Sequence, residues 1–244
     1  MASIIWSAKS GSDWSDSDLD AYNITVVPVQ PSEFFPNPDP SLDHIDPEIL
    51  SSPFDATPLS LDAARYLRHL RLAIDAHQES FVDDFAAGTL RLLGFDQDID
   101  PQSLLDTTFV LLVLVEDKTL ANQTHDVEAQ VIAEAIAAFQ SNNDKRTRRW
   151  LDPLQSMTIP CITMIGTLPT FYLVPVTREL SAAVISGEYP ATPTQVLQCR
   201  TELDSDLDSE AGMEDIEYRQ LAFKRFLAFK TLARTHWEPV LQGF

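Results

Sequence analysis

The chain is poor in glycine and cysteine, and each shortage excludes a class of site. Its seven glycines in 244 residues form no P-loop and no dinucleotide-binding fingerprint, and the G-x-S-x-G elbow of a serine hydrolase is absent. The two cysteines, Cys161 and Cys199, are too few for a disulfide framework, which predicts free thiols in a reducing compartment. The five histidines lack the spacing of zinc ligands, so a zinc site is not expected.

Long apolar runs are also lacking. The most apolar stretch, residues 159–176, is interrupted by three prolines and one glycine. The first residues do not combine a basic segment with an apolar one, as a secretion signal does. We therefore expect no contact with a membrane and a cytoplasmic or nuclear location rather than secretion.

Basic residues are outnumbered by acidic ones. The chain has 17 Lys and Arg against 37 Asp and Glu, which gives a net charge of −20. Because phosphates are bound by clustered cations, this balance disfavours broad binding to nucleic acid, and it disfavours anionic membrane surfaces too. A protein partner, in particular a basic one attracted by the acidic surface, is an open alternative.

The first part of the chain differs in composition from the rest. Residues 1–59 contain eight prolines and ten acidic residues but little periodicity, apart from one short strand expected over 24–29. Three phenylalanines, Phe34, Phe35 and Phe54, are unusual for a disordered tail. We expect an acidic, proline-rich N-terminal arm that packs through these aromatic anchors on a domain formed by residues 60–244.

Residues 60–244 show the pattern of an α/β domain. Apolar residues at helical spacing predict one long or broken helix over 60–93, closed by Gly94, and further helices over 127–142, 178–185 and 213–235. Strands are predicted over 109–115, 159–165 and 170–176. This order of elements predicts a central mixed sheet with helices on both faces.

The strand over 109–115 ends abruptly in Glu116, Asp117 and Lys118. Its seven consecutive apolar residues are typical of a strand buried on both faces. Side chains alternate along a strand, so Glu116 and Lys118 are expected on one face and Asp117 on the other. A carboxylate beside an ammonium group suits metal-assisted hydrolysis, and it is equally what a strand shows where it reaches water.

The order of a helix, an apolar strand ending in Glu-x-Lys, a helix and further strands resembles the PD-(D/E)XK nuclease fold. It is most similar to an uncharacterised fungal protein group with that fold. The matching segments are residues 20–24, 81–84, 90–95, 111–118, 129–143, 159–167 and 171–177. The resemblance implies a restriction-endonuclease-like domain that hydrolyses phosphodiester bonds of nucleic acid with Mg²⁺.

The resemblance also implies a role for each matched residue. Glu116 and an aspartate on a neighbouring strand, for which Asp106 is nearest, hold the metal, and Lys118 orients the attacking water. Gln130 matches a glutamine that is common on the next helix. Oxygen ligands suit Mg²⁺, which offsets phosphate charge and lowers the pKa of bound water. Members often add an acid on the first helix, here Glu79 or Asp83.

The position of the second metal ligand departs from this pattern. On one extended strand, Asp106 and Glu116 would lie about 33 Å apart, too far to share a metal. Residues 109–115 contain no turn residue that could reverse the chain. Asp96, Asp98 and Asp100 would need a compact loop that curls back over the strand end. The hairpin before the Glu-x-Lys strand is therefore expected to be shortened or lost. The alternative function is a catalytically degenerate nuclease-fold module that acts as a protein-interaction protein.

Four of the seventeen basic residues lie close together near the end of the helix predicted over 127–142. These are Lys145, Arg146, Arg148 and Arg149, and Trp150 follows them. They could contact phosphates while the indole stacks on a base. They could equally complement the dipole of a helix C-terminus. If the chain binds nucleic acid, this cluster is the first place where we expect the contact.

Overall fold

The computed structural model describes residues 9–75, 79–95, 113–117, 124–203 and 212–241. Within these residues, five strands form one mixed sheet in the order β1-β5-β4-β3-β2. β1 is parallel to β5 and β2 to β3, whereas β4 is antiparallel to both of its neighbours. The predicted α/β class with a central mixed sheet is confirmed. The strands are β1 (Ile24–Pro28), β2 (Val113–Asp117), β3 (Ser156–Ile165), β4 (Leu168–Thr177) and β5 (Thr194–Arg200).

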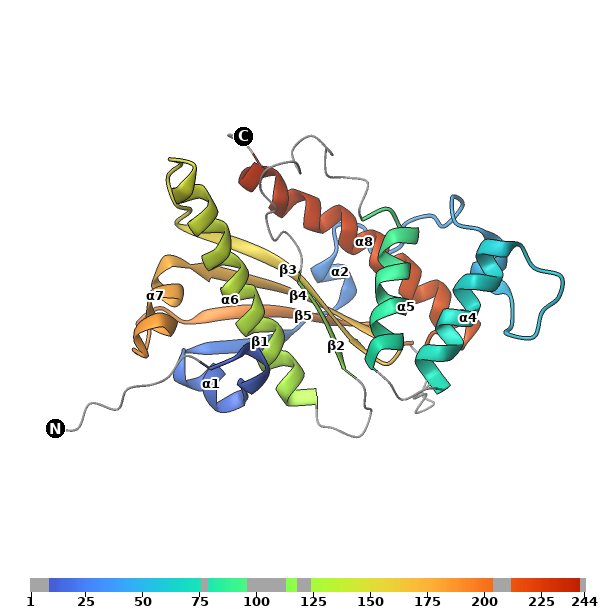
Figure 1. The fold of residues 1–244 in the computed structure, drawn as a ribbon, viewed down its shortest axis with the longest axis horizontal. Coiled ribbons are helices and arrows are strands. Elements are labelled where there is room, and N and C mark those ends of the chain that lie inside the picture. Colours follow the sequence, from blue (N-terminus) through green and yellow to red (C-terminus); the bar gives the residue numbers. More distant parts are fainter. Residues whose placement is uncertain (1–8, 76–78, 96–112, 118–123, 204–211, 242–244) are drawn as a thin grey trace.

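Helices surround the sheet (Figure 1), and the predicted ones are confirmed. The long or broken helix expected over 60–93 is two helices, and the last helix extends beyond residue 235. No helix in the described part of the chain has the length and apolarity needed to cross a membrane. The helices are η1 (Gly11–Asp13), α1 (Asp16–Ala21), α2 (Pro31–Phe34), α3 (Pro47–Ser51), α4 (Leu61–Asp75), α5 (Glu79–Leu92), α6 (Thr124–Arg148), α7 (Arg178–Ser186) and α8 (Ile216–Leu241).

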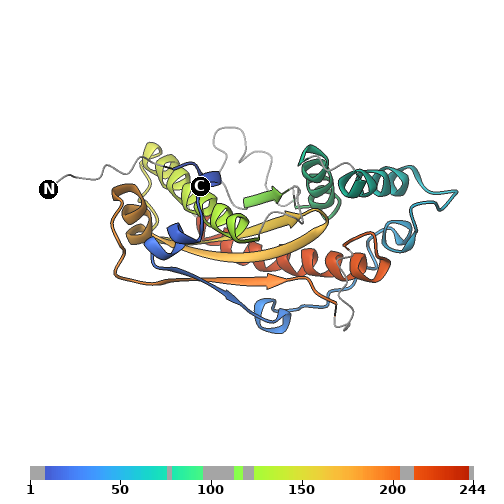
Figure 2. The ribbon, with the colours of Figure 1, turned by 90° about the horizontal axis from the view of Figure 1, so that it is seen from below.

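The two longest helices, α6 and α8, cover opposite faces of the sheet (Figures 1 and 2). Phe171 and Tyr172 are consecutive on β4, so their side chains point to opposite faces. The centroid of the Phe171 ring lies 4.9 Å from that of Phe229 on α8. On the other face, Tyr172 is hydrogen-bonded to Gln198, which also contacts Glu128 of α6. Helices therefore lie on both faces, as expected.

Local sequence explains where several elements begin and end. The Thr177 hydroxyl accepts a hydrogen bond from the Leu180 backbone N–H at 3.1 Å and caps the first turn of α7. Gly187 ends α7 in a left-handed conformation with φ of 69°. Gly166 has φ of 58° in the tight turn between β3 and β4. These positions are readable from the sequence because each depends only on neighbouring residues.

β5 has no counterpart among the predicted strands. Its seven residues mix polar and apolar side chains, yet Thr194 and Gln198 are buried together with Val196 and Cys199. Buried polar groups are tolerated when they are hydrogen-bonded, as Gln198 is to Tyr172 at 3.2 Å. Polar residues therefore occupy buried positions of β5, and the sequence does not show the alternation of apolar and polar residues typical of a strand. The hydrogen-bond partners that allow this burial come from distant parts of the chain.

The N-terminal segment contributes β1 to the sheet and aromatic side chains to the core. The strand expected over 24–29 is confirmed as β1, and it pairs with β5. Phe34 and Phe35 are buried, and the Phe35 ring centroid lies 5.8 Å from that of Phe171. β1 belongs to the same sheet as the strands of residues 60–244. The division of the chain at residue 59 into an arm and a domain stays a prediction.

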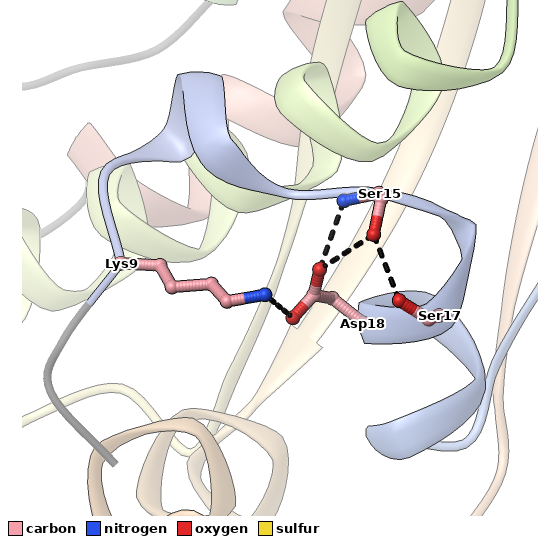
Figure 3. A network of polar contacts seen from close by, with 4 residues as sticks. All are labelled: Lys9, Ser15, Ser17 and Asp18. Carbon is pink, nitrogen blue, oxygen red and sulfur yellow. Dashed lines mark hydrogen bonds and ion pairs between the residues drawn. The ribbon is translucent and has the colours of Figure 1, made fainter.

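Asp18 organises the start of the N-terminal segment (Figure 3). One oxygen of its carboxylate accepts hydrogen bonds from the Ser15 backbone N–H at 2.9 Å and the Ser15 hydroxyl at 3.0 Å. Lys9 Nζ binds the other oxygen at 2.7 Å. Burial raises the pKa of Asp18, but the bonds from Lys9 and Ser15 outweigh it and the pKa lies below its usual range. The network therefore stabilises the fold at neutral pH, and its contribution is lost as the carboxylate is protonated in acid.

Candidate functional site

The acidic end of β2 lies at the edge of the sheet where β1, β3 and β5 also end, since these four strands run in the same direction. The Cα of Glu116 pairs with that of Met164, and Asp117 pairs with Ile165. Ligands of open α/β sheets bind outside the carboxyl ends of parallel strands. The predicted strand is confirmed for residues 113–115, while residues 109–112 lie outside the described part of the chain.

Most other residues predicted for the metal site fall outside the residues that the structure describes, and so does the side chain of Glu116. The distance between Glu116 and a second carboxylate, and the presence or loss of the preceding hairpin, therefore stay predictions. The residues concerned are Asp96, Asp98, Asp100, Asp106 and Lys118.

The two acids predicted on the first helix lie on α5. Glu79 is its first residue, and its side chain is not described. Asp83 follows one turn later and is half-buried. Because α5 packs against β2, Asp83 is carried by a helix that neighbours the Glu-x-Lys strand. A role of either acid in metal binding stays a prediction.

Gln130 lies in the first half of α6 and is half-buried. Its side-chain amide donates to Glu134 Oε1 at 3.1 Å, one turn further along the same helix. Side chains two positions apart on an α-helix point in directions about 200° apart, so Gln130 faces away from Glu128. Glu128 reaches the sheet, and the structure therefore does not place Gln130 beside it. A catalytic role for Gln130 stays a prediction.

A group of polar side chains that was not predicted lies between α6 and the sheet. We call it the Glu128 cluster. The Gln198 amide donates to Tyr172 Oη at 3.2 Å and contacts Glu128 Oε1. Arg200 Nη2 lies 3.6 Å from the same carboxylate oxygen. The members are Glu128 of α6, Thr163 of β3, Tyr172 of β4, and Gln198 and Arg200 of β5.

Exposure and charge determine what the Glu128 cluster can do. The side chain of Glu128 is 15% exposed, whereas that of Arg200 is 50% exposed. Burial, and to a smaller extent the charge of Glu128, raise the pKa of Tyr172 to about 12, against hydrogen bonds from Gln198 and Thr163. Tyr172 is therefore a neutral phenol at pH 7 and suits donating a hydrogen bond rather than accepting a proton. Arg200 is the member of the cluster that solvent or an anionic ligand reaches.

Sequence patterns gave one weak signal for this cluster. Gln198 and Arg200 are two residues apart, which on a strand places both on one face. Glu128 stands 70 residues earlier in the chain than Gln198. Nothing local to either segment indicates that they meet, because their contact depends on the position of β5 in the sheet.

A groove of about 870 Å³ opens at the ends of β1 and β5, and Arg200 lines it. Two further cations on α8 line the same groove. Lys224 Nζ forms an ion pair with Asp39 at 2.5 Å, and Arg225 Nη1 donates to the Pro38 carbonyl oxygen at 2.5 Å. These contacts tie α8 to the N-terminal segment. Arg200 connects the groove with the Glu128 cluster.

Replacement of Tyr172 by phenylalanine is expected to reduce the loss of stability in alkaline solution. The pKa of Tyr172 is raised to about 12, whereas an unfolded tyrosine titrates near 10. The stabilisation that arises because the folded protein keeps the Tyr172 phenol protonated is thus fully present below about pH 10 and is lost as the pH rises towards about 12. At about pH 11, ionisation in the unfolded chain lowers the free energy of unfolding by about 1.4 kcal/mol. Urea unfolding between about pH 8 and pH 11 measures this difference.

The matched control is Tyr189→Phe, because Tyr189 is exposed. Burial also raises the pKa of Tyr66 and Tyr218, but these residues contribute equally to wild type and variants. Their effect cancels when pH profiles are compared. An identical pH dependence in wild type and Tyr172→Phe would contradict the assignment.

Metal-ligand geometry can be judged only for side chains that the structure describes. Among these, no three Asp, Glu, His or Cys residues lie close enough together to hold a metal ion. The predicted ligands Glu116 and Asp106 are not among them. The Mg²⁺ site therefore stays a prediction.

The predicted basic cluster lies at the other end of α6 from Glu128. Lys145, Arg146 and Arg148 occupy its last turn, and Arg149 follows. Arg148 is twenty residues further along the helix than Glu128, which corresponds to about 30 Å. The structure thus separates the basic cluster from the Glu128 cluster by the length of α6 rather than bringing the two together.

The resemblance to PD-(D/E)XK nucleases rests on the sequence segments given above. Within the described residues the structure shows an α/β fold with a mixed sheet, and the restriction-endonuclease-like fold stays a prediction. Comparison with protein-family models, with curated proteins and with solved structures finds no match for this chain.

Proposed function

We propose that the chain is a nuclease-like protein with a restriction-endonuclease-like fold that hydrolyses phosphodiester bonds of nucleic acid with Mg²⁺. The observation that carries the proposal is the β2–α6–β3 unit. Its first strand ends in Glu116 and Asp117 at the carboxyl edge of a parallel pair. Parallel strands end there in a position suited to ligands, and carboxylates are the ligands that Mg²⁺ prefers.

Each residue of the strand end has a part in this proposal. Glu116 and an upstream aspartate, Asp106 being nearest in sequence, would hold the ion. When bound, Mg²⁺ supplies positive charge at the phosphate and lowers the pKa of a water ligand. Lys118 would hold that water and neutralise charge on the phosphate oxygens.

The Glu128 cluster supports the proposal from the same edge of the sheet. Arg200 lies near the end of β5, half exposed, and its guanidinium is 3.6 Å from the Glu128 carboxylate. A guanidinium offers a planar set of donors that matches phosphate geometry. We assign Arg200 a role in binding substrate phosphate, with Glu128 as the residue that positions it.

Calorimetric titration with Mg²⁺ and Mn²⁺ tests the proposal. Wild type is expected to bind one ion, and Glu116→Ala is expected to weaken binding at least tenfold, about 1.4 kcal/mol, because the charged ligand is lost. The control is Glu188→Ala, which removes an exposed carboxylate beyond α7. It is expected to bind as wild type does, and circular dichroism establishes that both variants fold.

Two outcomes would overturn the proposal. One is the absence of metal binding by wild type at a metal concentration of about 10 mM, far above the dissociation constant expected for a working site. The other is equal binding by wild type and Glu116→Ala. Either would favour the alternative, a catalytically degenerate nuclease-fold module that binds a protein partner.

A further inference from the structure

Trp150 is the most exposed large apolar side chain of the described part of the chain. It is 97% exposed, although it lies only two residues beyond the end of α6, most of whose residues are buried or half-buried. Tryptophan usually buries most of its surface in a folded protein. An indole presented to solvent on the end of a rigid helix therefore calls for an explanation beyond packing.

The backbone at Trp150 is strained. Its φ is +62°, in the left-handed region that favours glycine. The Leu151 N–H donates to the Arg146 carbonyl at 3.0 Å, and the Trp150 N–H donates to the Thr147 carbonyl at 3.1 Å. These two bonds form a Schellman motif with Trp150 at the position normally taken by glycine. The chain keeps a tryptophan where glycine would be more stable.

Four cations come shortly before the indole in the sequence. Lys145, Arg146, Arg148 and Arg149 are four of the seventeen basic residues in the whole chain. Arg148 is exposed and the other three are half-buried. Arg146 Nε donates to the Asp152 carbonyl oxygen at 2.9 Å, which holds that guanidinium against the loop after α6. We call these four residues and Trp150 the Trp150 patch.

We propose that the Trp150 patch binds single-stranded nucleic acid, with a base stacked on the indole and neighbouring phosphates on the cations. A single strand offers exposed base faces, and stacking on an aromatic side chain is independent of sequence. A duplex hides its base faces. A duplex or an anionic membrane also brings an extended negative surface towards a chain of net charge −20. A single strand can reach a small patch while it avoids the acidic remainder.

The ligand class rests on the proposed nuclease function, but the site does not coincide with the proposed site of hydrolysis. Arg148 of the patch lies about 30 Å along α6 from Glu128. A strand stacked at 3.4 Å per nucleotide needs about nine nucleotides to cover that distance. The patch therefore acts as an anchor for long strands, and oligonucleotides of about five nucleotides cannot occupy both places at once.

The test measures binding of a fluorescent 20-nucleotide oligothymidylate by anisotropy, at low salt and in EDTA so that no hydrolysis occurs. Trp150→Gly is expected to weaken binding about tenfold. The same variant relieves the strain at φ +62° and is expected to raise Tm by about 2–4 °C. Weaker binding by a more stable variant cannot come from unfolding.

Arg148→Ala and Arg65→Ala form a matched pair, since both arginines are exposed on helices and Arg65 lies on α4. Arg148→Ala is expected to weaken binding several-fold and to reduce the slope of log K against log salt by about 0.7. Arg65→Ala is expected to leave both unchanged. Unaltered affinity of Trp150→Gly would overturn the inference, as would binding to phosphatidylserine vesicles without binding to the oligonucleotide.

Glu116→Ala separates this inference from the proposed function. In EDTA it is expected to bind the oligonucleotide as wild type does, because Glu116 lies on β2, which precedes α6 in the chain, whereas the patch lies at the C-terminal end of α6. Oligonucleotide binding without metal binding would support the anchor and would overturn the proposed nuclease function. Hydrolysis of the 20-nucleotide strand that is unaffected by Trp150→Gly would overturn the anchor and leave the proposed nuclease function standing.

Discussion

Replacement of Arg219 by alanine is expected to lower the free energy of unfolding by about 3–5 kcal/mol. Arg219 is 0% exposed, an unusual position for an arginine. It lies in the first turn of α8, and its guanidinium is hydrogen-bonded to four backbone carbonyl oxygens rather than to a carboxylate. The acceptors are those of Met213 at 2.7 Å, Ile49 at 3.0 Å, Ser52 at 2.9 Å and Glu214 at 3.3 Å.

The loss of stability arises because the substitution leaves the carbonyl groups that accept from Arg219 without a donor. A buried acceptor without a donor costs roughly 1–3 kcal/mol. The total is smaller than four such costs because Ser52 and Glu214 are half-buried and can recover water. Two of the acceptors belong to α3 and the residue after it, so the substitution also removes two hydrogen bonds that join the N-terminal segment to α8.

Urea unfolding measures the effect, with two further variants for comparison. Arg219→Lys keeps the charge but cannot reach four carbonyls with one ammonium group, and it is expected to lose about half as much stability. Arg65→Ala removes an exposed arginine from α4 and is expected to change stability by less than about 0.5 kcal/mol. A loss below about 1 kcal/mol in Arg219→Ala would show that these hydrogen bonds do not hold the two segments together.

Replacement of Phe171 by alanine is expected to cost about 3–5 kcal/mol. Its ring is fully buried on the α8 face of β4. The ring centroid lies 5.3 Å from that of Phe226, 4.9 Å from that of Phe229 and 5.8 Å from that of Phe35. Because three other rings surround it, the cavity left by alanine cannot close without moving α8 or the N-terminal segment.

A double-mutant cycle of Phe171→Leu and Phe35→Leu tests whether the N-terminal segment is docked through this contact. The two rings meet edge to face with an interplanar angle of 78°. Such pairs contribute about 0.5–1.5 kcal/mol beyond their buried area, which is the expected coupling energy. Leu173→Ala serves as the control, since Leu173 is half-buried two residues further along the same strand. Additive losses would mean that the contact between Phe35 and Phe171 does not help to dock the N-terminal segment on the sheet.

The helices and the β3–β4 hairpin could be predicted from the sequence because their signals are local. Apolar residues recur at helical spacing in α6 and α8, and Gly166 and Gly187 stand where the chain needs a left-handed residue. The end of β2 in Glu116 and Asp117 was predicted for the same reason. Only its backbone is described, so its chemistry rests on the proposal.

The candidate sites were predicted less completely, for reasons that differ from one residue to the next. The basic residues from Lys145 to Arg149 follow one another in sequence, and their gathering needs no tertiary contact. Glu128 and Gln198 meet only because β5 is inserted between β1 and β4. A local pattern contains no information about which strands become neighbours.

By itself, the sequence determined the fold class, the periodic helices, the acidic balance and the clustering of cations before Trp150. Tertiary structure decided the order of the strands, the burial of Arg219 and the exposure of Trp150. The physical reason is the range of the interactions concerned. Helical periodicity and turn conformations depend on residues a few positions apart, whereas the burial of a polar group depends on partners that only the folded chain brings within hydrogen-bonding distance.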